Sequence, residues 1–181
     1  MCAAPVFANG ADAPSEAFTR TVERLNNEKT KSDVRYGSDG IKVVCTVLPN
    51  REVTAVAWKI YNPKRIELKI TQDDIRLSDQ VRQLSRIEPA RASDLLYGSQ
   101  VVGQTMEPFV DGATPPEFLE PPIQTEPQAQ EDLLDSAFNF VVTDSSLIAG
   151  LTYYKRYGAN ERVRSEITLN GQTLTFNFGK E

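Results

Sequence analysis

The sequence predicts a mainly β protein with antiparallel strands, a short N-terminal helix and a long proline-rich insertion. The supporting observations are alternating β-branched runs in residues 41–79, an Asn170-Gly171 turn between two further alternating runs, and a change of composition in residues 107–135. With 181 residues, of which 40% are hydrophobic, the chain is long enough to bury one sizeable core. We therefore expect residues 1–12 to be a flexible leader and residues 13–181 to be a single domain.

The first two predicted strands span residues 41–48 and 52–61. Their side chains alternate between two faces and are rich in β-branched types, which is typical of strands. Pro49-Asn50 between them favours a turn. Trp58, the only tryptophan, is expected to anchor the core, and Cys45 is expected to be a small buried residue.

A third strand is predicted over residues 66–70, which would complete a three-stranded meander. Apolar Ile66, Leu68 and Ile70 alternate with charged residues, which favours a sheet with one face on the core and the other in water. The strand is expected to resume over residues 75–78 after a bend at Asp73-Asp74.

Helices are predicted in three places. Phe18, Val22 and Leu25 form one apolar stripe behind a cap at Asp12 or Ser15, with Arg20, Glu23 and Arg24 on the outer side. Ser93-Asp94 is expected to cap a single turn that ends at Gly98. A third short helix is predicted over residues 130–137.

The C-terminal part contains the clearest local signal. Residues 162–169 and 172–178 alternate on either side of Asn170-Gly171, the strongest short hairpin signal in a sequence. Another strand is predicted over residues 147–157, and a shorter one near residues 138–142. Residues 81–87 fit a short strand or a helical turn about equally well.

The N-terminus predicts export. Cys2 directly after the start methionine is the candidate for lipidation in a bacterial lipoprotein, with residues 1–12 as the tether. Two alternatives stay open: the end of a cleaved secretory signal at residues 6–8, and an ordinary cytosolic start with a chance cysteine. We expect location in the periplasm or at the outer membrane of a bacterium, with membrane contact only through a lipid anchor.

Residues 107–135 are interpreted as an acidic, proline-rich loop or arm. Residues 92–154 contain ten acidic and no basic side chains, although the whole chain has a net charge of only −5. Within the arm, Phe109, Phe118 and Leu119 exceed what a spacer needs. They are candidate binding residues that dock on the domain itself or on a protein partner, and we favour the domain itself.

Tyr153, Tyr154 and Tyr157 are further candidate binding residues, because cations are interleaved with them. Such a mixture is found on nucleic-acid surfaces, but net acidity and predicted export favour an ordinary strand face with half-buried tyrosines. We expect no nucleic-acid partner.

The absence of histidine excludes most familiar catalytic arrangements, including Ser-His-Asp and Cys-His pairs and histidine-ligated zinc. Asp73, Asp74 and Asp79 lack the spacing of a calcium loop and are better explained as turn residues. We therefore expect no enzyme, no cofactor and no metal site.

The order of features in residues 52–89 resembles exported bacterial immunoglobulin-like β-sandwich domains, which lipoproteins often carry. The residues that carry the resemblance are Val56-Ala57-Trp58-Lys59-Ile60-Tyr61-Asn62, Ile66-Glu67-Leu68-Lys69-Ile70, Asp74-Ile75-Arg76-Leu77 and Ile87-Glu88-Pro89. The resemblance implies an antiparallel immunoglobulin-like sandwich and an envelope location, and it implies no catalytic residue.

The expected function is that of a non-catalytic, envelope-associated binding or structural module with a protein partner. Two alternatives stay open. One is a carboxylate-dependent hydrolase, which two converging acidic residues in a cleft would support. The other is a carrier of a small apolar ligand, which a closed apolar cavity behind Trp58 would support.

Overall fold

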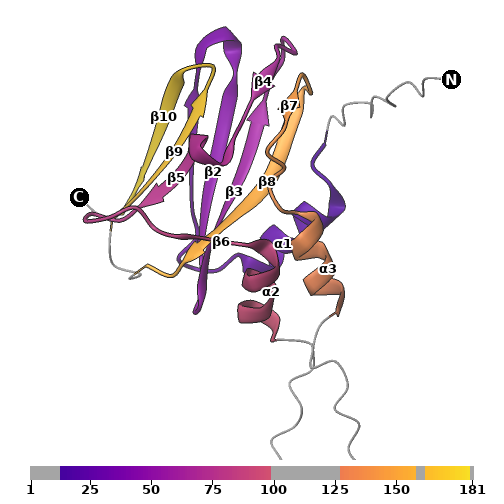
Figure 1. The fold of residues 1–181 in the computed structure, drawn as a ribbon, viewed down its shortest axis with the longest axis vertical. Helices are drawn as coiled ribbons and strands as arrows, with labels where there is room; N and C mark the ends of the chain where they lie inside the picture. Colours follow the sequence, from indigo (N-terminus) through magenta and orange to yellow (C-terminus); the bar gives the residue numbers. More distant parts are fainter. Residues whose placement is uncertain (1–12, 99–126, 158–161, 180–181) are drawn as a thin grey trace, which may run out of the picture.

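The structure, a computed structural model, describes residues 13–98, 127–157 and 162–179 (Figure 1). Within these ranges the chain is mainly β, with antiparallel sheets and three short α-helices. The elements in chain order are α1 (Glu16–Leu25), β1 (Lys31–Tyr36), η1 (Ser38–Gly40), β2 (Lys42–Pro49), β3 (Val53–Tyr61), β4 (Leu68–Lys69), η2 (Gln72–Asp74), β5 (Ile75–Ser78), β6 (Arg86–Ile87), α2 (Pro89–Tyr97), α3 (Pro127–Asp135), β7 (Val142–Thr143), β8 (Leu147–Lys155), β9 (Val163–Leu169) and β10 (Gln172–Phe178).

The largest sheet has five strands in the order β1-β2-β3-β8-β6, and every neighbouring pair is antiparallel. Trp58 of β3 lies at its centre, opposite Cys45 of β2 on one side and Gly150 of β8 on the other. A second sheet has the order β10-β9-β5, and β4 pairs with β7 in a two-stranded ribbon.

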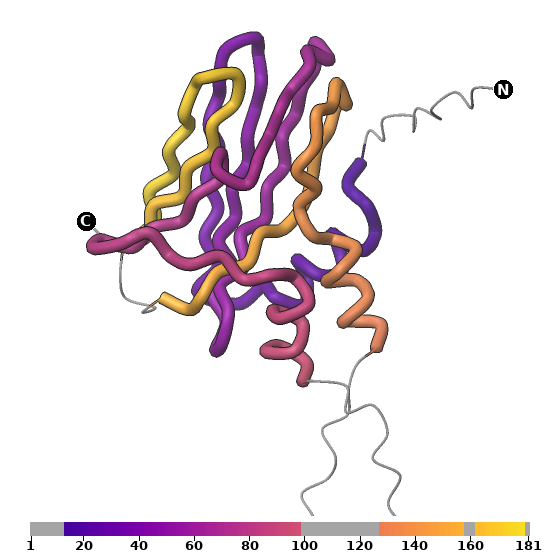
Figure 2. The backbone as a smooth tube through the Cα atoms, in the orientation of Figure 1, coloured from indigo at the N-terminus to yellow at the C-terminus, as the bar shows by residue number. Residues whose placement is uncertain are grey.

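The five-stranded sheet packs against apolar side chains on both faces, although the end that carries Tyr36 and Tyr61 is exposed. Because side chains alternate along a strand, Val56, Trp58 and Ile60 of β3 enter one hydrophobic cluster, which also holds residues of β9 and β10. Ala55 and Ala57 enter a second cluster with residues of all three helices. The helices gather at one end of the sheet, at the bottom of Figures 1 and 2.

Trp58 anchors the core, as predicted. Its side chain is fully buried, its indole N–H donates to Thr152 Oγ1 at 3.1 Å, and its ring meets Phe176 of β10 edge-on. The space around the ring is therefore filled by protein side chains. Cys45 is also buried, as predicted.

The predicted helix cap at Ser15, the helix end at Gly98 and the hairpin turn at Asn170-Gly171 are confirmed. Ser15 caps α1 by accepting a hydrogen bond from the Phe18 N–H at 3.2 Å, and Gly98 ends α2 with φ of 80°. Asn170 and Gly171 both have positive φ, 48° and 80°, as the tight turn between β9 and β10 requires. Helix α2 begins earlier than predicted, because Pro89 is its first residue, a position where proline is well tolerated.

The predicted three-stranded meander is wrong in its third strand. Strand β3 pairs with β8, whereas β4 pairs with β7 and β5 pairs with β9. The buried Asn62 side chain holds a wide turn by bonding both the N–H and the C=O of Ile66, and Arg65 within the turn has φ of 50°. This turn directs the chain away from β3.

The remaining expectations for strands and helices are met only in part. Residues 66–70 keep the predicted half-solvated pattern, with Leu68 buried and Lys69 exposed. The five-stranded sheet does not, because helices cover part of the face that Ala55 and Ala57 line. Strand β1 was not predicted. Residues 127–135, placed in the proline-rich arm, form helix α3, which begins before the predicted residue 130.

Candidate functional site

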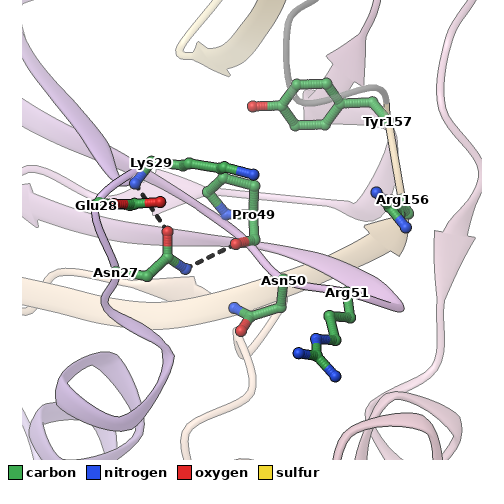
Figure 3. Close-up of a pocket in the computed structure, with 8 residues that line it drawn as sticks. All are labelled: Asn27, Glu28, Lys29, Pro49, Asn50, Arg51, Arg156 and Tyr157. Atoms are coloured by element: carbon green, nitrogen blue, oxygen red, sulfur yellow. Dashed lines mark hydrogen bonds between the residues drawn. The ribbon is translucent and has the colours of Figure 1, made fainter.

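A pocket of about 420 Å³ lies where three segments distant in sequence meet (Figure 3). The segments are the loop after α1, the turn between β2 and β3, and the end of β8. The residues that line it are Asn27, Glu28, Lys29, Pro49, Asn50, Arg51, Arg156 and Tyr157.

Two asparagines fix the rim of this pocket. Asn27 Nδ2 donates to the carbonyl oxygens of Pro49 at 2.7 Å and Leu25 at 3.1 Å, and its Oδ1 accepts the Lys29 N–H at 2.9 Å. Asn50 Nδ2 donates to the same Leu25 oxygen at 3.3 Å. The bonds to Leu25 satisfy a carbonyl at the end of α1 that has no intrahelical partner, and the bond to Pro49 reaches the end of β2. The loop after α1 is therefore held against the β2–β3 turn.

The pocket is cationic. Lys29, Arg51 and Arg156 contribute three positive charges, and Glu28 is the acidic residue among those that line it. The three cations are exposed. Within residues 13–98, 127–157 and 162–179, none of them forms an ion pair with an acidic side chain. Cations that lack counter-charges around a concave surface attract anions, because their potentials add there.

Tyr157 forms the buried wall of the pocket. Its side chain is 7% exposed, and burial raises the pKa of its phenol above the ordinary value. The hydroxyl therefore stays protonated at neutral pH and is available as a hydrogen-bond donor. The arrangement suits the binding of carboxylate or phosphate groups, with arginine forks and a lysine for charge.

Of the three tyrosines predicted as binding residues, only Tyr157 lines this pocket. Tyr153 is buried in the helix-side cluster, where its hydroxyl donates to the Leu133 carbonyl at 3.3 Å, and burial raises its pKa. Tyr154 is buried in the other cluster, beneath the Arg86 guanidinium. Tyr153 and Tyr154 are thus core residues. Cys2, Phe109, Phe118 and Leu119 lie outside the described residues.

Nothing in the amino-acid sequence marks Lys29, Arg51 and Arg156 as one group. Each lies in a different segment, and no spacing within any segment connects it with the others. They come together because the β2–β3 turn and the end of β8 lie at the same end of the antiparallel sheet. Knowledge that β3 pairs with β8 would therefore have been enough to predict that Arg51 and Arg156 lie close together.

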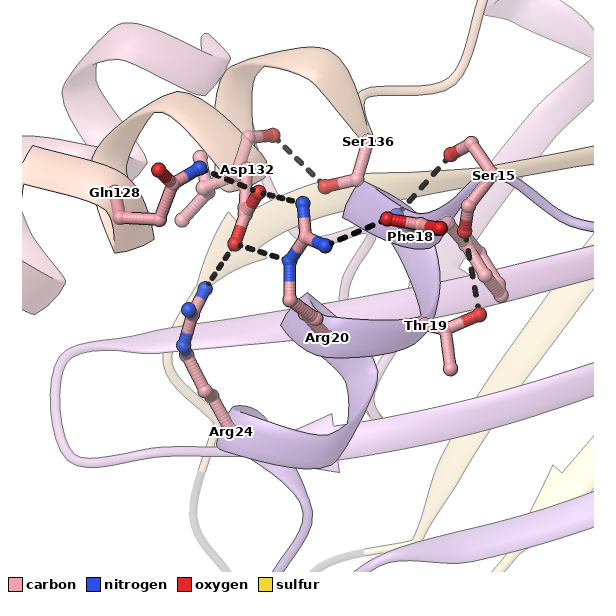
Figure 4. A network of polar contacts seen from close by, with 10 residues as sticks. Ser15, Phe18, Thr19, Arg20, Arg24, Gln128, Asp132 and Ser136 are labelled. Carbon is pink, nitrogen blue, oxygen red and sulfur yellow. Dashed lines mark hydrogen bonds and ion pairs between the residues drawn. The ribbon is translucent and has the colours of Figure 1, made fainter.

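A polar network joins α1 to α3 (Figure 4). Asp132 of α3 is 2% exposed and accepts hydrogen bonds from Arg20, Arg24 and Gln128. The bond from the Arg20 guanidinium contributes most to holding the pKa of Asp132 far below its usual range, and the pKa of Arg20 is raised in return. The sequence pattern places Arg20 and Arg24 on the outer side of α1 and gives no sign that they bind α3.

Among the other acidic residues that the structure describes, some stabilise turns and others are exposed to solvent. Asp74 accepts bonds from the N–H and hydroxyl of Thr71, and Asp79 accepts from the N–H groups of Val81 and Arg82, so both are turn residues as predicted. Asp94 and Glu131 line a groove between α2 and α3, but both are exposed, whereas the acid of a carboxylate pair usually sits in drier surroundings. In the described ranges no three potential ligands come together in a metal-binding group.

Among the helices that the structure describes, none is both long and apolar enough to span a bilayer. Comparisons with protein-family models, with curated proteins and with solved structures gave no match.

Proposed function

We propose that this protein is a non-catalytic binding module of a bacterial cell envelope, which binds an acidic segment of a protein partner in the cationic pocket. The observation that carries the proposal is the convergence of Lys29, Arg51 and Arg156, from three separate segments, around one pocket of about 420 Å³. The buried Tyr157 adds a neutral hydrogen-bond donor to its wall.

The fold that we propose is an immunoglobulin-like sandwich with helices added on one face. Two observations support it: the five-stranded and three-stranded sheets contribute to one shared hydrophobic cluster, and Trp58 of one sheet meets Phe176 of the other. Proposed export rests on Cys2 and on the resemblance of residues 52–89 to envelope domains.

The expected affinity is moderate and depends on salt. An exposed ion pair contributes only about 0.2–1 kcal/mol, so three such pairs, assisted by the Tyr157 hydroxyl, suit a reversible complex. Screening shortens the range of these charges to about 8 Å at physiological ionic strength. We therefore expect binding to weaken steadily as salt is added.

The test compares two triple variants with the same change in net charge. One is Lys29→Gln, Arg51→Gln, Arg156→Gln, and the control is Arg65→Gln, Lys69→Gln, Arg91→Gln, whose side chains are exposed outside the pocket. A partner captured from the envelope fraction with the wild-type protein is identified, purified and titrated against all three proteins. We expect the pocket triple alone to lose binding. Equal binding by both triples would refute the assignment of the pocket.

The envelope location has its own test. The gene is expressed with its native upstream sequence, and the membrane, periplasmic and cytosolic fractions are probed for the protein. Recovery only in the cytosol would reject the export part of the proposal without affecting the pocket.

A further inference from the structure

A second surface lies on the five-stranded sheet at the end away from the helices. Tyr36 of β1 pairs with Lys42 of β2, Lys42 pairs with Tyr61 of β3, and Tyr61 pairs with Leu147 of β8. Directly paired residues of antiparallel strands project from the same face. These four residues, the tyrosine row, therefore form one line across the sheet.

The tyrosine row lies on the same face as the helices but is not covered by them. Tyr61 has the same alternation along β3 as Ala55 and Ala57, which pack under the helices. Tyr36 is nevertheless 69% exposed and Tyr61 is 37% exposed. Exposed large side chains that gather in one place usually mark a binding surface.

The row borders a shallow groove of about 410 Å³, which Gly40, Pro63 and Ser146 complete. Lys42 lies between the two tyrosines, with its Nζ 5.3 Å from the centroid of the Tyr61 ring. This cation–π contact holds the ammonium group beside an aromatic face. The groove thus offers flat apolar rings and one fixed positive charge.

The spacing of the rings limits what fits. Tyr36 and Tyr61 are separated by one strand, and neighbouring strands lie about 4.8 Å apart, so the Cα atoms of the two tyrosines are roughly 10 Å from each other. That distance matches the repeat of two sugar rings in an extended β-linked glycan. The C–H faces of pyranose rings are apolar and stack on aromatic side chains, whereas their hydroxyl groups remain in water.

The charge of the surface selects among glycans. In the next row, the Lys59 Nζ lies 5.6 Å from the centroid of the Phe18 ring of α1, so Lys42 is the charged side chain that lines the groove. A glycan that bears carboxylates complements its positive charge. Strand pairing with a second copy of the protein through β1 is disfavoured. The Val34 N–H already donates to Asp33 Oδ1 at 2.8 Å, and charged residues along β1 oppose edge-to-edge pairing.

We propose that the tyrosine row binds an anionic, β-linked glycan strand, with sugar rings stacked on Tyr36 and Tyr61 and a carboxylate near Lys42. This site is separate from the cationic pocket, which lies at the opposite end of β3. Its test is therefore independent of the proposed function.

Purified peptidoglycan sacculi serve as the anionic glycan in a co-sedimentation assay, and microcrystalline cellulose serves as a neutral β-linked glycan. The variants are Tyr36→Ala with Tyr61→Ala, and Lys42→Gln. The control is Val141→Ala with Val142→Ala, which removes exposed apolar side chains elsewhere. Thermal melting and far-UV circular dichroism confirm that each variant is folded before its binding is compared.

We expect wild-type protein and control to bind sacculi and the double tyrosine variant to bind about tenfold more weakly, as the loss of two aromatic contacts implies. Lys42→Gln is expected to weaken binding to sacculi and to leave the weaker binding to cellulose unchanged. Undiminished binding by the tyrosine variant would overturn the proposal. So would wild-type protein that binds neither polymer, or a dimer in light scattering that the tyrosine variant abolishes.

Discussion

Arg20 and Asp132 are joined by two parallel hydrogen bonds, from Nε to Oδ2 at 3.0 Å and from Nη2 to Oδ1 at 2.8 Å. This fork-to-fork geometry is stronger and more directional than a single contact. It connects α1 to α3, and Arg24 and Gln128 bind the same carboxylate. The Asp132 side chain therefore ties α1 to α3.

Replacement Asp132→Asn is expected to destabilise the protein. The amide keeps the shape of the side chain but loses the charge that two guanidinium groups share, and one amide hydrogen faces a donor. We expect the melting temperature to fall by several degrees. Asp135→Asn on the same helix is the control, because Asp135 is exposed. An Asp132→Asn variant as stable as Asp135→Asn would show that the network contributes little.

The same network predicts how stability depends on pH. Because its folded-state pKa is depressed, Asp132 stabilises the folded protein fully above its unfolded value of about 3.9. That contribution is lost as the pH falls below about 4 toward the folded pKa. Urea unfolding should therefore show a constant gap between wild type and Asp132→Asn from neutral pH to mild acid, and a gap that shrinks below that point. A gap that widens in acid would contradict this assignment.

Local structure was largely predictable from the sequence, because its signals lie within a few residues. The capped helix α1, the strands β2 and β3 and the Asn170-Gly171 hairpin depend on caps, alternation and turn chemistry. The sequence of β3 also contains apolar residues on both of its faces, a pattern that favours a strand covered on both sides.

The candidate site was not predictable in the same way. Arg20 and Asp132 are 112 positions apart, and Lys29, Arg51 and Arg156 meet only once β3 has paired with β8. A charged residue in a loop looks the same whether it faces open water or a pocket. Long-range strand pairing decides whether such a residue faces open water or a pocket. The turn that Asn62 holds after β3 directs the chain away from β3 and so changes which strands pair.

The hydrogen bond between Trp58 and Thr152 is expected to contribute measurably to stability. Thr152→Val keeps the volume of the side chain but leaves the buried indole N–H without its partner, which costs about 1–3 kcal/mol. Trp58→Phe removes that donor and part of the ring. In a double-mutant cycle by urea unfolding, Thr152→Val should cost less in the Trp58→Phe background than in the wild type. Strict additivity would show that the bond is energetically silent.

Cys45 is expected to resist thiol reagents until the protein unfolds. Burial raises the pKa of its thiol well above the ordinary value, and the thiolate is the reactive form. In a Cys2→Ala variant, Ellman's reagent should therefore react slowly with native protein at mildly alkaline pH and at once in denaturant. Rapid stoichiometric reaction of the native variant would mean that β2 opens readily at this position.

Gly150 is expected to tolerate no side chain. A Cβ at this position would lie 2.5 Å from the Phe138 Cα and 3.0 Å from its backbone nitrogen, which are main-chain atoms. They are held in place because the Phe138 N–H donates to the Leu151 carbonyl at 2.8 Å. Gly150→Ala must therefore separate β8 from the chain beside it, and we expect a loss of roughly 2 kcal/mol or more in the free energy of unfolding. Gly37→Ala is the matched control, because the nearest neighbour of its added Cβ is a side-chain atom, Gln172 Oε1 at 3.2 Å, and not the main chain. Equal urea midpoints for the two variants would show that residues 136–138 do not pack on β8 as closely as the structure has them.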